Sequence, residues 1–149
     1  MMVSTKGRYA LRIMLDIALQ SGDGYTSLKS IADRQGISLK YLEAIASVLC
    51  HGGMLESLRG KVGGYRLSKP AENYTVGSII KLTEGSVAPV ACLECDDTQC
   101  DRAVNCLTLP MWQELDNIIE NYLESITLQD LISGKLSNIS AIGNERSTK

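Results

Sequence analysis

Apolar residues recur every three or four positions in six stretches of the chain, the spacing that places them on one face of a helix. A serine or threonine suited to cap a helix precedes most of these stretches, such as Ser27 and Ser38, and a glycine follows several, such as Gly36. The pattern predicts helices over residues 6–20, 28–34, 39–50, 76–84, 108–125 and 128–133.

The second and third predicted helices are joined by a tight turn at Gly36, an arrangement typical of a helix-turn-helix. On residues 39–50 one face is apolar and consists of Leu39, Leu42, Ile45, Ala46 and Leu49. The other face begins with residues that a recognition helix could present to base edges, namely Ser38, Lys40, Tyr41 and Glu43. Taken alone, the pair also fits an ordinary amphipathic hairpin of two helices.

Two short strands are predicted directly after this pair, over residues 55–58 and 64–67. A glycine-rich turn containing Arg59, Gly60 and Lys61 joins them. A hairpin in this position is a wing, and cations at its tip suit the electronegative minor groove of DNA. A nucleotide site is disfavoured, because the turn lacks the G-x4-G-K-[ST] order and no helix follows it. The predicted fold is mainly α with a small β-wing.

Charge is unevenly distributed along the 149 residues. Residues 1–69 hold ten Lys and Arg against five Asp and Glu, a balance of +5, whereas residues 70–149 have a balance of −7 from five against twelve. This asymmetry suggests that the first half faces a polyanion. Arg8 and Arg12 lie one helical turn apart in that half and are either solvated charges or a phosphate clamp. No apolar run approaches the roughly 18 residues that a membrane helix needs.

Four of the five cysteines lie in one polar, acidic stretch with the spacing C-x2-C-x4-C-x5-C, at Cys92, Cys95, Cys100 and Cys106. Such a segment cannot build its own core, and a bound metal centre would supply the order. A disulfide-pinned loop is the alternative, but no signal peptide precedes the segment, and free thiols are the norm in the cytoplasm, where we expect the protein to act. The spacing leaves iron–sulfur and zinc equally open. The fifth cysteine, Cys50, is interpreted as structural or incidental.

The longest amphipathic stretch, over residues 108–125, carries a wide apolar stripe that extends to Ile126. Because so small a domain offers little core to cover it, we interpret it as a dimerisation seam in preference to simple packing. The predicted interface residues are Trp112, Leu115, Ile118, Ile119, Tyr122 and Ile126.

Enzymatic activity is not expected, because the chain has one histidine, His51, and no convergent acid–base set. A redox dithiol at Cys92 and Cys95 would want a helix N-terminus to lower the thiol pKa, and none is evident. The predicted parts are a winged helix-turn-helix domain, a connecting helix and loop, a cysteine-rich loop, a dimerisation helix with a short C-terminal helix, and a disordered tail, over residues 1–69, 70–91, 92–106, 107–134 and 135–149.

Four motifs stand out along the chain, namely STKGRYA (4–10), GISLKYLE (36–43), RGKVGGY (59–65) and the segment from Cys106 to Trp112. Together, over about residues 2–133, they resemble the IscR/NsrR/CymR superfamily of bacterial winged-helix repressors, and the IscR branch most closely. The resemblance implies a homodimer on a palindromic DNA operator, with an iron–sulfur cluster between the wing domain and the dimerisation helix. It implies a repressor that senses cluster status and controls cluster assembly or related genes.

Carried over by position, Cys92, Cys100 and Cys106 match the family's three ligand cysteines. Leu109 stands where IscR-type proteins often have a histidine ligand, and Arg8, in the region from which NsrR-type members borrow a ligand, cannot ligate. Cys95 is therefore the candidate fourth ligand. The resemblance favours [2Fe–2S] over [4Fe–4S], and a structural zinc or a thiol-redox switch at the same cysteines is the alternative.

Overall fold

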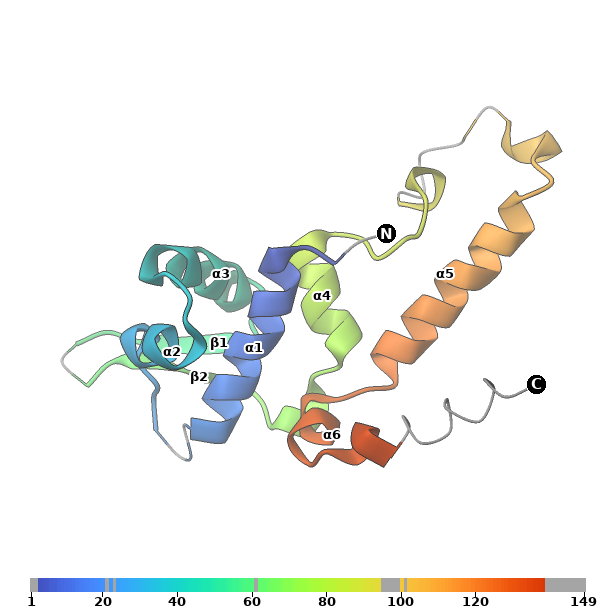
Figure 1. The fold of residues 1–149 in the computed structure, drawn as a ribbon. Helices are drawn as coiled ribbons and strands as arrows, with labels where there is room; N and C mark the ends of the chain where they lie inside the picture. Colours follow the sequence, from blue (N-terminus) through green and yellow to red (C-terminus); the bar gives the residue numbers. More distant parts are fainter. Residues whose placement is uncertain are drawn as a thin grey trace.

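The computed structural model describes residues 3–20, 22, 24–60, 62–94, 100 and 102–138. Figure 1 shows helix α1 in the middle of the molecule, with α2, α3 and the hairpin β1–β2 on one side, α4 and α6 on the other, and α5 extending away from this body. The elements are α1 (Thr5–Gln20), α2 (Leu28–Gln35), α3 (Leu39–His51), β1 (Leu55–Leu58), β2 (Gly64–Leu67), α4 (Val76–Glu84), α5 (Leu109–Glu124) and α6 (Leu128–Ile132), with short 3-10 turns η1 (Ala71–Asn73), η2 (Ala91–Leu93), η3 (Ala103–Asn105) and η4 (Lys135–Asn138).

The helices begin and end within one residue of their predicted limits because the local signals operate as expected. Four caps share one geometry, in which the hydroxyl accepts a hydrogen bond from the backbone N–H three residues later, at Ser27, Ser38, Thr75 and Thr127. Gly36 ends α2 with a φ of 65°, a left-handed conformation that glycine adopts without strain. The mainly-α fold with a small β-wing is confirmed.

The main core lies between α1, α3 and α4. The apolar face of α1 is fully buried, and the faces of the other helices close over it. Its completely inaccessible side chains are Ala10, Ile13, Met14, Ile17, Ile31, Leu42, Ile45, Ala46, Leu49, Ile79 and Leu128. The helix-turn-helix is therefore built directly on α1.

The wing is an antiparallel hairpin in which Leu55 pairs with Leu67 and Leu58 with Gly64. A further bridge joins Tyr65 to Thr26, just before α2, with two backbone hydrogen bonds of 2.8 Å. A Cβ on Gly64 would lie 2.6 Å from the carbonyl oxygen of Thr26, so only glycine permits this close approach. The hairpin is thereby fixed to the helix-turn-helix.

A second, smaller core joins α4 to the C-terminal part of the chain. Val76, Ile80, Val87 and Ile126 are buried in it, and α5 contributes the partly buried Ile119 and Leu123. Ile126 lies two residues beyond the end of α5, and its carbonyl accepts a 2.8 Å hydrogen bond from the N–H of Val76. The ammonium of Lys81 on α4 pairs with Glu120 at 2.9 Å and Glu124 at 3.3 Å on α5.

Residues 135–138, expected to begin a disordered tail, form the short turn η4, and the rest of that expectation, 139–149, lies outside the described residues. None of the helices described is both long enough and apolar enough to span a membrane.

One buried charge fixes α2 against α1. The carboxylate of Asp16 on α1 is 5% exposed and accepts hydrogen bonds from the guanidinium of Arg34, with Nε at 3.1 Å, and from the amide of Gln35 at 2.8 Å. Burial acts to raise the pKa of Asp16, but the hydrogen bonds from Arg34 and Gln35 and the guanidinium charge outweigh it, and the pKa falls below its ordinary value of 3.8.

We expect Asp16→Asn to destabilise the fold by about 2 kcal/mol at pH 7, less than the roughly 3–5 kcal/mol for breaking a fully buried pair, because the Arg34 side chain is 37% exposed. A lowered native pKa stabilises the fold above the unfolded pKa of about 4 and loses this effect as the pH falls through the native pKa. The difference between wild type and variant should therefore shrink below pH 4. Urea unfolding from pH 7 to pH 2.5 measures this difference in the free energy of unfolding. Asp33→Asn, at an exposed position on α2, is the control. Equal effects of the two substitutions would contradict this role for Asp16.

Candidate DNA interface and cysteine-rich segment

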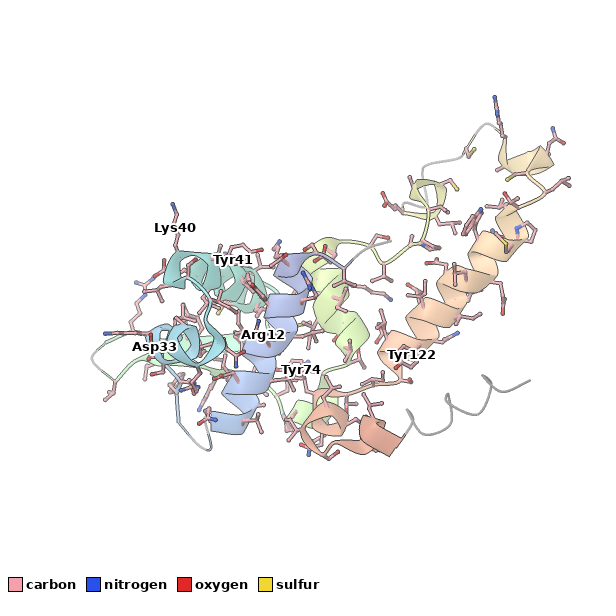
Figure 2. The ribbon with its side chains drawn as sticks, viewed as in Figure 1. Arg12, Asp33, Lys40, Tyr41, Tyr74 and Tyr122 are labelled. Carbon is pink, nitrogen blue, oxygen red and sulfur yellow. The ribbon has the colours of Figure 1, made fainter. Side chains whose placement is uncertain are left out.

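The outer face of α3 presents a row of exposed side chains. Lys40 and Glu43 lie in its first turns, and Figure 2 shows Lys40 pointing away from the body of the protein. Ser38 caps the helix, with its hydroxyl 3.4 Å from the N–H of Tyr41. The exposed row continues along the helix through Ala44, Ser47 and His51. This face combines a cation, a carboxylate and small polar groups, a set that can read base edges.

Tyr41 does not face outward as the sequence suggested. Its side chain is half-buried against the main core, and its ring meets the ring of Tyr9 edge-on, with centroids 5.7 Å apart and planes at 74°. Tyr41, predicted to lie on the polar face of α3, therefore contacts α1 instead. Nothing in the local sequence signals this contact, because Tyr9 lies 32 positions earlier in the chain.

The tip of the wing carries one cation among the described residues. Arg59 is exposed, and Gly60 adopts a φ of 116°, which requires glycine; Lys61 lies outside the described residues. Behind the tip, Arg66 pairs with Glu56 at 2.7 Å and lies over the ring of Tyr25, 4.9 Å from its centroid. These contacts set the hairpin against the segment that precedes α2.

The two arginines of α1 have different surroundings. Arg8 is exposed, and its guanidinium donates a 3.3 Å hydrogen bond to the hydroxyl of Thr5 on the same helix. Arg12 is directed to α2, where its Nε and Nη2 donate to the side-chain and backbone oxygens of Gln35 at 2.9 and 2.7 Å. Arg8 and Arg12 together are a candidate phosphate clamp in the sequence. The guanidinium of Arg12 instead forms hydrogen bonds to Gln35 within the protein.

The cysteine-rich segment lies at the far end of α5 from the main body (Figure 1). Cys92 belongs to η2 and is half-buried, Cys100 is exposed, and Cys106 is half-buried between η3 and α5; all three thiols are free, and Cys95 lies outside the described residues. Within the described part of the chain, no three His, Cys, Asp or Glu side chains converge on a point that could hold a metal.

The donor chemistry nevertheless fits a metal centre. The Sγ of Cys106 lies 3.4 Å from the hydroxyl of Thr108, and hydrogen bonds from the side chain and backbone of Thr108 lower the pKa of this thiol from its ordinary value of 9.0. A thiolate is the form that binds iron or zinc. Cys50 on α3 differs, because burial raises its pKa and packing against the main core holds it there.

The predicted dimerisation stripe divides into two parts. Ile119 and Ile126 pack inside their own chain, and Trp112 is half-buried. Leu115, Ile118 and Tyr122 are 38%, 56% and 55% exposed, and Met111, which the sequence analysis missed, joins them at 55%. Positions 111, 115, 118 and 122 share one helix face, so the structure presents an uncovered apolar stripe (the α5 stripe).

A cavity of about 520 Å³ lies between α1, the hairpin and the segment leading to η1. Its charged lining residues include Glu56 and Arg66, which already pair with each other, and it touches neither the outer face of α3 nor the cysteines. It does not assemble a set of convergent unpaired groups around a ligand.

The helix-turn-helix on α1, its hairpin and the exposed face of α3 define a winged-helix DNA-binding protein. The family described as "Rrf2: Iron-dependent Transcriptional regulator" matches residues 3–134. The chain belongs to this family of transcriptional regulators.

Similar proteins agree with this assignment. The HTH-type transcriptional regulator IscR of Photobacterium profundum is 43% identical over 132 residues, which cover 89% of this chain and 76% of the relative. Among solved structures, T. potens IscR has a TM-score of 0.72 at 39% identity, covering 91% of this chain and 88% of that one. CymR, the global cysteine regulator of B. subtilis, has a TM-score of 0.73 at 38% identity, covering 89% and 97%. These relatives are transcriptional regulators, which confirms the family resemblance and the prediction that the chain is not an enzyme.

Proposed function

We propose that this chain is a homodimeric, IscR-like repressor that binds a palindromic operator and senses an iron–sulfur cluster held by its own cysteines. It would control cluster-assembly or related genes. One observation carries the proposal. A winged domain similar to that of IscR proteins is joined, in the same chain, to a segment with free thiols that directly precedes the N-terminus of α5, an amphipathic helix with an uncovered apolar stripe.

Cys92, Cys100 and Cys106 would hold the cluster, with Cys95 as the fourth ligand and [2Fe–2S] as the preferred type. Occupancy of the site by a cluster would depend on the supply of iron and on oxidants, and binding the cluster would order the thiolates around it. Thr108 contributes by favouring the thiolate of Cys106. Leu109, the first residue of α5, offers no ligand atom in place of a histidine.

A second copy of this chain is the proposed occupant of the α5 stripe. Apolar side chains at 111, 115, 118 and 122 line one face of a helix that has no fully buried residue, and the opposite side is already packed on α4. Two such stripes facing each other across a two-fold axis would bury both. The two winged domains would then meet two half-sites of a palindrome, about 34 Å or one helical turn apart.

The operator contacts are assigned to three places. Ser38, Lys40 and Glu43 approach base edges from α3, with Tyr41 beside them. Arg59, Gly60 and Lys61 of the wing approach the minor groove, and Arg8 of α1 approaches a phosphate.

The cysteine-rich segment acts on DNA indirectly. Between Cys92 and Cys106 it holds Glu94, Asp96, Asp97 and Asp101 against Arg102, a balance of −3, so it is repelled by phosphates. It connects α4, which packs on α1, to α5, the proposed dimer helix. Ordering it would therefore set the two winged domains relative to each other.

Cluster binding is tested by anaerobic purification, followed by visible absorbance and assays of iron and acid-labile sulfide. We expect Cys92→Ala, Cys100→Ala and Cys106→Ala to abolish the chromophore and Cys95→Ala to weaken or abolish it, because each removes a thiolate ligand. Cys50→Ala, on α3, is the matched control and should leave the spectrum intact. Zinc without absorbance would favour the structural-zinc alternative, and neither metal would favour a thiol-redox switch.

The dimer is tested with Leu115→Glu combined with Ile118→Glu. Loss of two buried apolar side chains at about 1.5–3 kcal/mol each should raise the dimer dissociation constant at least about a hundredfold. Gln113→Glu with Asn117→Glu adds the same charge at exposed positions of α5 outside the stripe and should remain dimeric. Sedimentation velocity measures the outcome, with circular dichroism to verify folding; a dimeric stripe variant would place the interface elsewhere.

Glu43 should act in specificity more than in affinity. A carboxylate near DNA is repelled unless it accepts a hydrogen bond from a cytosine amino group, so it penalises sequences without one. Glu43→Ala should reduce discrimination between operator variants by about tenfold while changing affinity for the best operator less than about threefold. Glu72→Ala, an exposed carboxylate in η1, controls for the loss of charge. A uniform change on all operator variants would contradict the role.

Sensing is tested by operator affinity of holo-protein, apo-protein and Cys106→Ala at one fixed salt concentration, because phosphate contacts make affinity salt-dependent. We expect holo-protein to differ from the other two. By linkage, a cluster that strengthens operator binding must be held more tightly on the operator. Equal affinities of all three on every operator would reduce the cluster to a structural element.

A further inference from the structure

One edge of α1 contacts both helices of the helix-turn-helix across its turn. The residues involved are Tyr9, Arg12 and Asp16, spaced so that they follow one line along the helix surface. Asp16 reaches the last turn of α2, Arg12 reaches its last residue, and Tyr9 reaches the first turn of α3. Figure 2 places Arg12 and Tyr41 where α1 and α3 meet.

Gln35 is the centre of these contacts. Its amide nitrogen donates to Asp16 at 2.8 Å, its amide oxygen accepts from the Nε of Arg12 at 2.9 Å, and its backbone carbonyl accepts from Nη2 of the same arginine at 2.7 Å. Gly36, in the left-handed conformation, follows at once, and α3 begins three residues later at Leu39. The end of α2 is thus fixed to α1 directly before the chain turns into the recognition helix.

The arginine continues the contact toward α3. Its guanidinium carbon lies 5.2 Å from the centroid of the Tyr9 ring, and that ring meets Tyr41 edge-on. Tyr41 is flanked on α3 by Lys40 and, two residues on, by Glu43, the exposed residues proposed to meet base edges. A row of contacts therefore runs from the buried carboxylate of Asp16 to the base-reading end of α3.

We propose that Arg12 and Gln35 are positioning residues for operator recognition, holding the α2–α3 turn against α1 so that Lys40 and Glu43 meet the bases at one fixed angle. The inference rests on the proposed reading of bases by α3. It assigns to Arg12, an exposed arginine on a basic domain, a role that does not involve phosphate. Binding elements held in one orientation before contact avoid the cost of ordering them on DNA.

Salt dependence distinguishes this role from a phosphate contact. Losing one phosphate contact lowers the slope of log affinity against log salt by about 0.9, whereas losing a contact inside the protein leaves the number of released counterions unchanged. Arg12→Ala should lower operator affinity by roughly three- to tenfold, the effect of one or two net hydrogen bonds, with an unchanged slope. Arg12→Lys keeps the charge but loses the planar fork, and should weaken binding to a similar extent.

Gln35→Met keeps the length of the side chain and removes both amide contacts, and it should reproduce the effect of Arg12→Ala. The double variant should bind no worse than about twofold below either single variant, because both substitutions break one network. Arg12→Ala, Gln35→Met and the double variant should also reduce the discrimination between operator variants that depends on Glu43. Arg8→Ala, one turn earlier on α1, is the matched control and should lower both affinity and slope.

The measurement is fluorescence anisotropy on a labelled operator from 50 to 300 mM salt (roughly the range in which phosphate contacts dominate). It uses full-length protein in the form, holo or apo, that binds the operator more tightly, below the unfolding temperature of each variant. A lowered slope for Arg12→Ala with binding preserved in Arg12→Lys would make Arg12 a phosphate contact and overturn the proposal. Unchanged affinity and discrimination in both Arg12→Lys and Gln35→Met would overturn it as well. Absence of DNA binding by the wild type in both its holo- and apo-forms would instead overturn the proposed function.

Discussion

The burial of one face of α1 is the constraint on which the rest of the structure depends. Ala10, Ile13, Met14 and Ile17 are inaccessible to solvent, and α2, α3, α4, α6 and β2 all contact this helix. Ile13, Met14 and Ile17 each contribute about 1.5–3 kcal/mol by their burial, so neither the helix-turn-helix nor α4 can move away from α1 without a large loss. The winged domain and the connection toward the cysteines therefore share one rigid support.

Glu84 makes that connection specific. It ends α4, and its Oε1 accepts hydrogen bonds from the N–H of Gly7 at 2.8 Å and from the hydroxyl of Ser4 at 2.6 Å, which satisfies one of the backbone donors in the first turn of α1. The ammonium of Lys6 donates to the carbonyl of Thr83 at 3.1 Å. A Cβ on Gly7 would lie 2.5 Å from the Glu84 carboxylate, so the contact depends on glycine. The segment leading to the cysteines thus begins at a point held by the first turn of α1.

Local signals in the sequence were sufficient for the helices, the caps and both strands, because periodicity, hydroxyl caps and glycine turns act over a few residues. The pairing of Tyr41 with Tyr9 and of Arg12 with Gln35 could not be predicted, since both join residues more than twenty positions apart. Periodicity located the apolar arc of α5 but could not separate Ile119, which packs on its own chain, from Ile118, which does not. Cysteine spacing likewise offered candidate donor atoms without their arrangement in space, and the proposal of an iron–sulfur cluster rests on family resemblance.

The uncovered stripe on α5 also has a consequence for the lifetime of the protein. In the proposed dimer, the fraction of chains with the stripe covered depends on how many copies are present, because association obeys mass action. A newly made or diluted chain would expose Met111, Leu115, Ile118 and Tyr122 together, a surface on which proteases and chaperones can act. Abundance and survival would then be coupled, because scarce copies would be removed faster than plentiful ones.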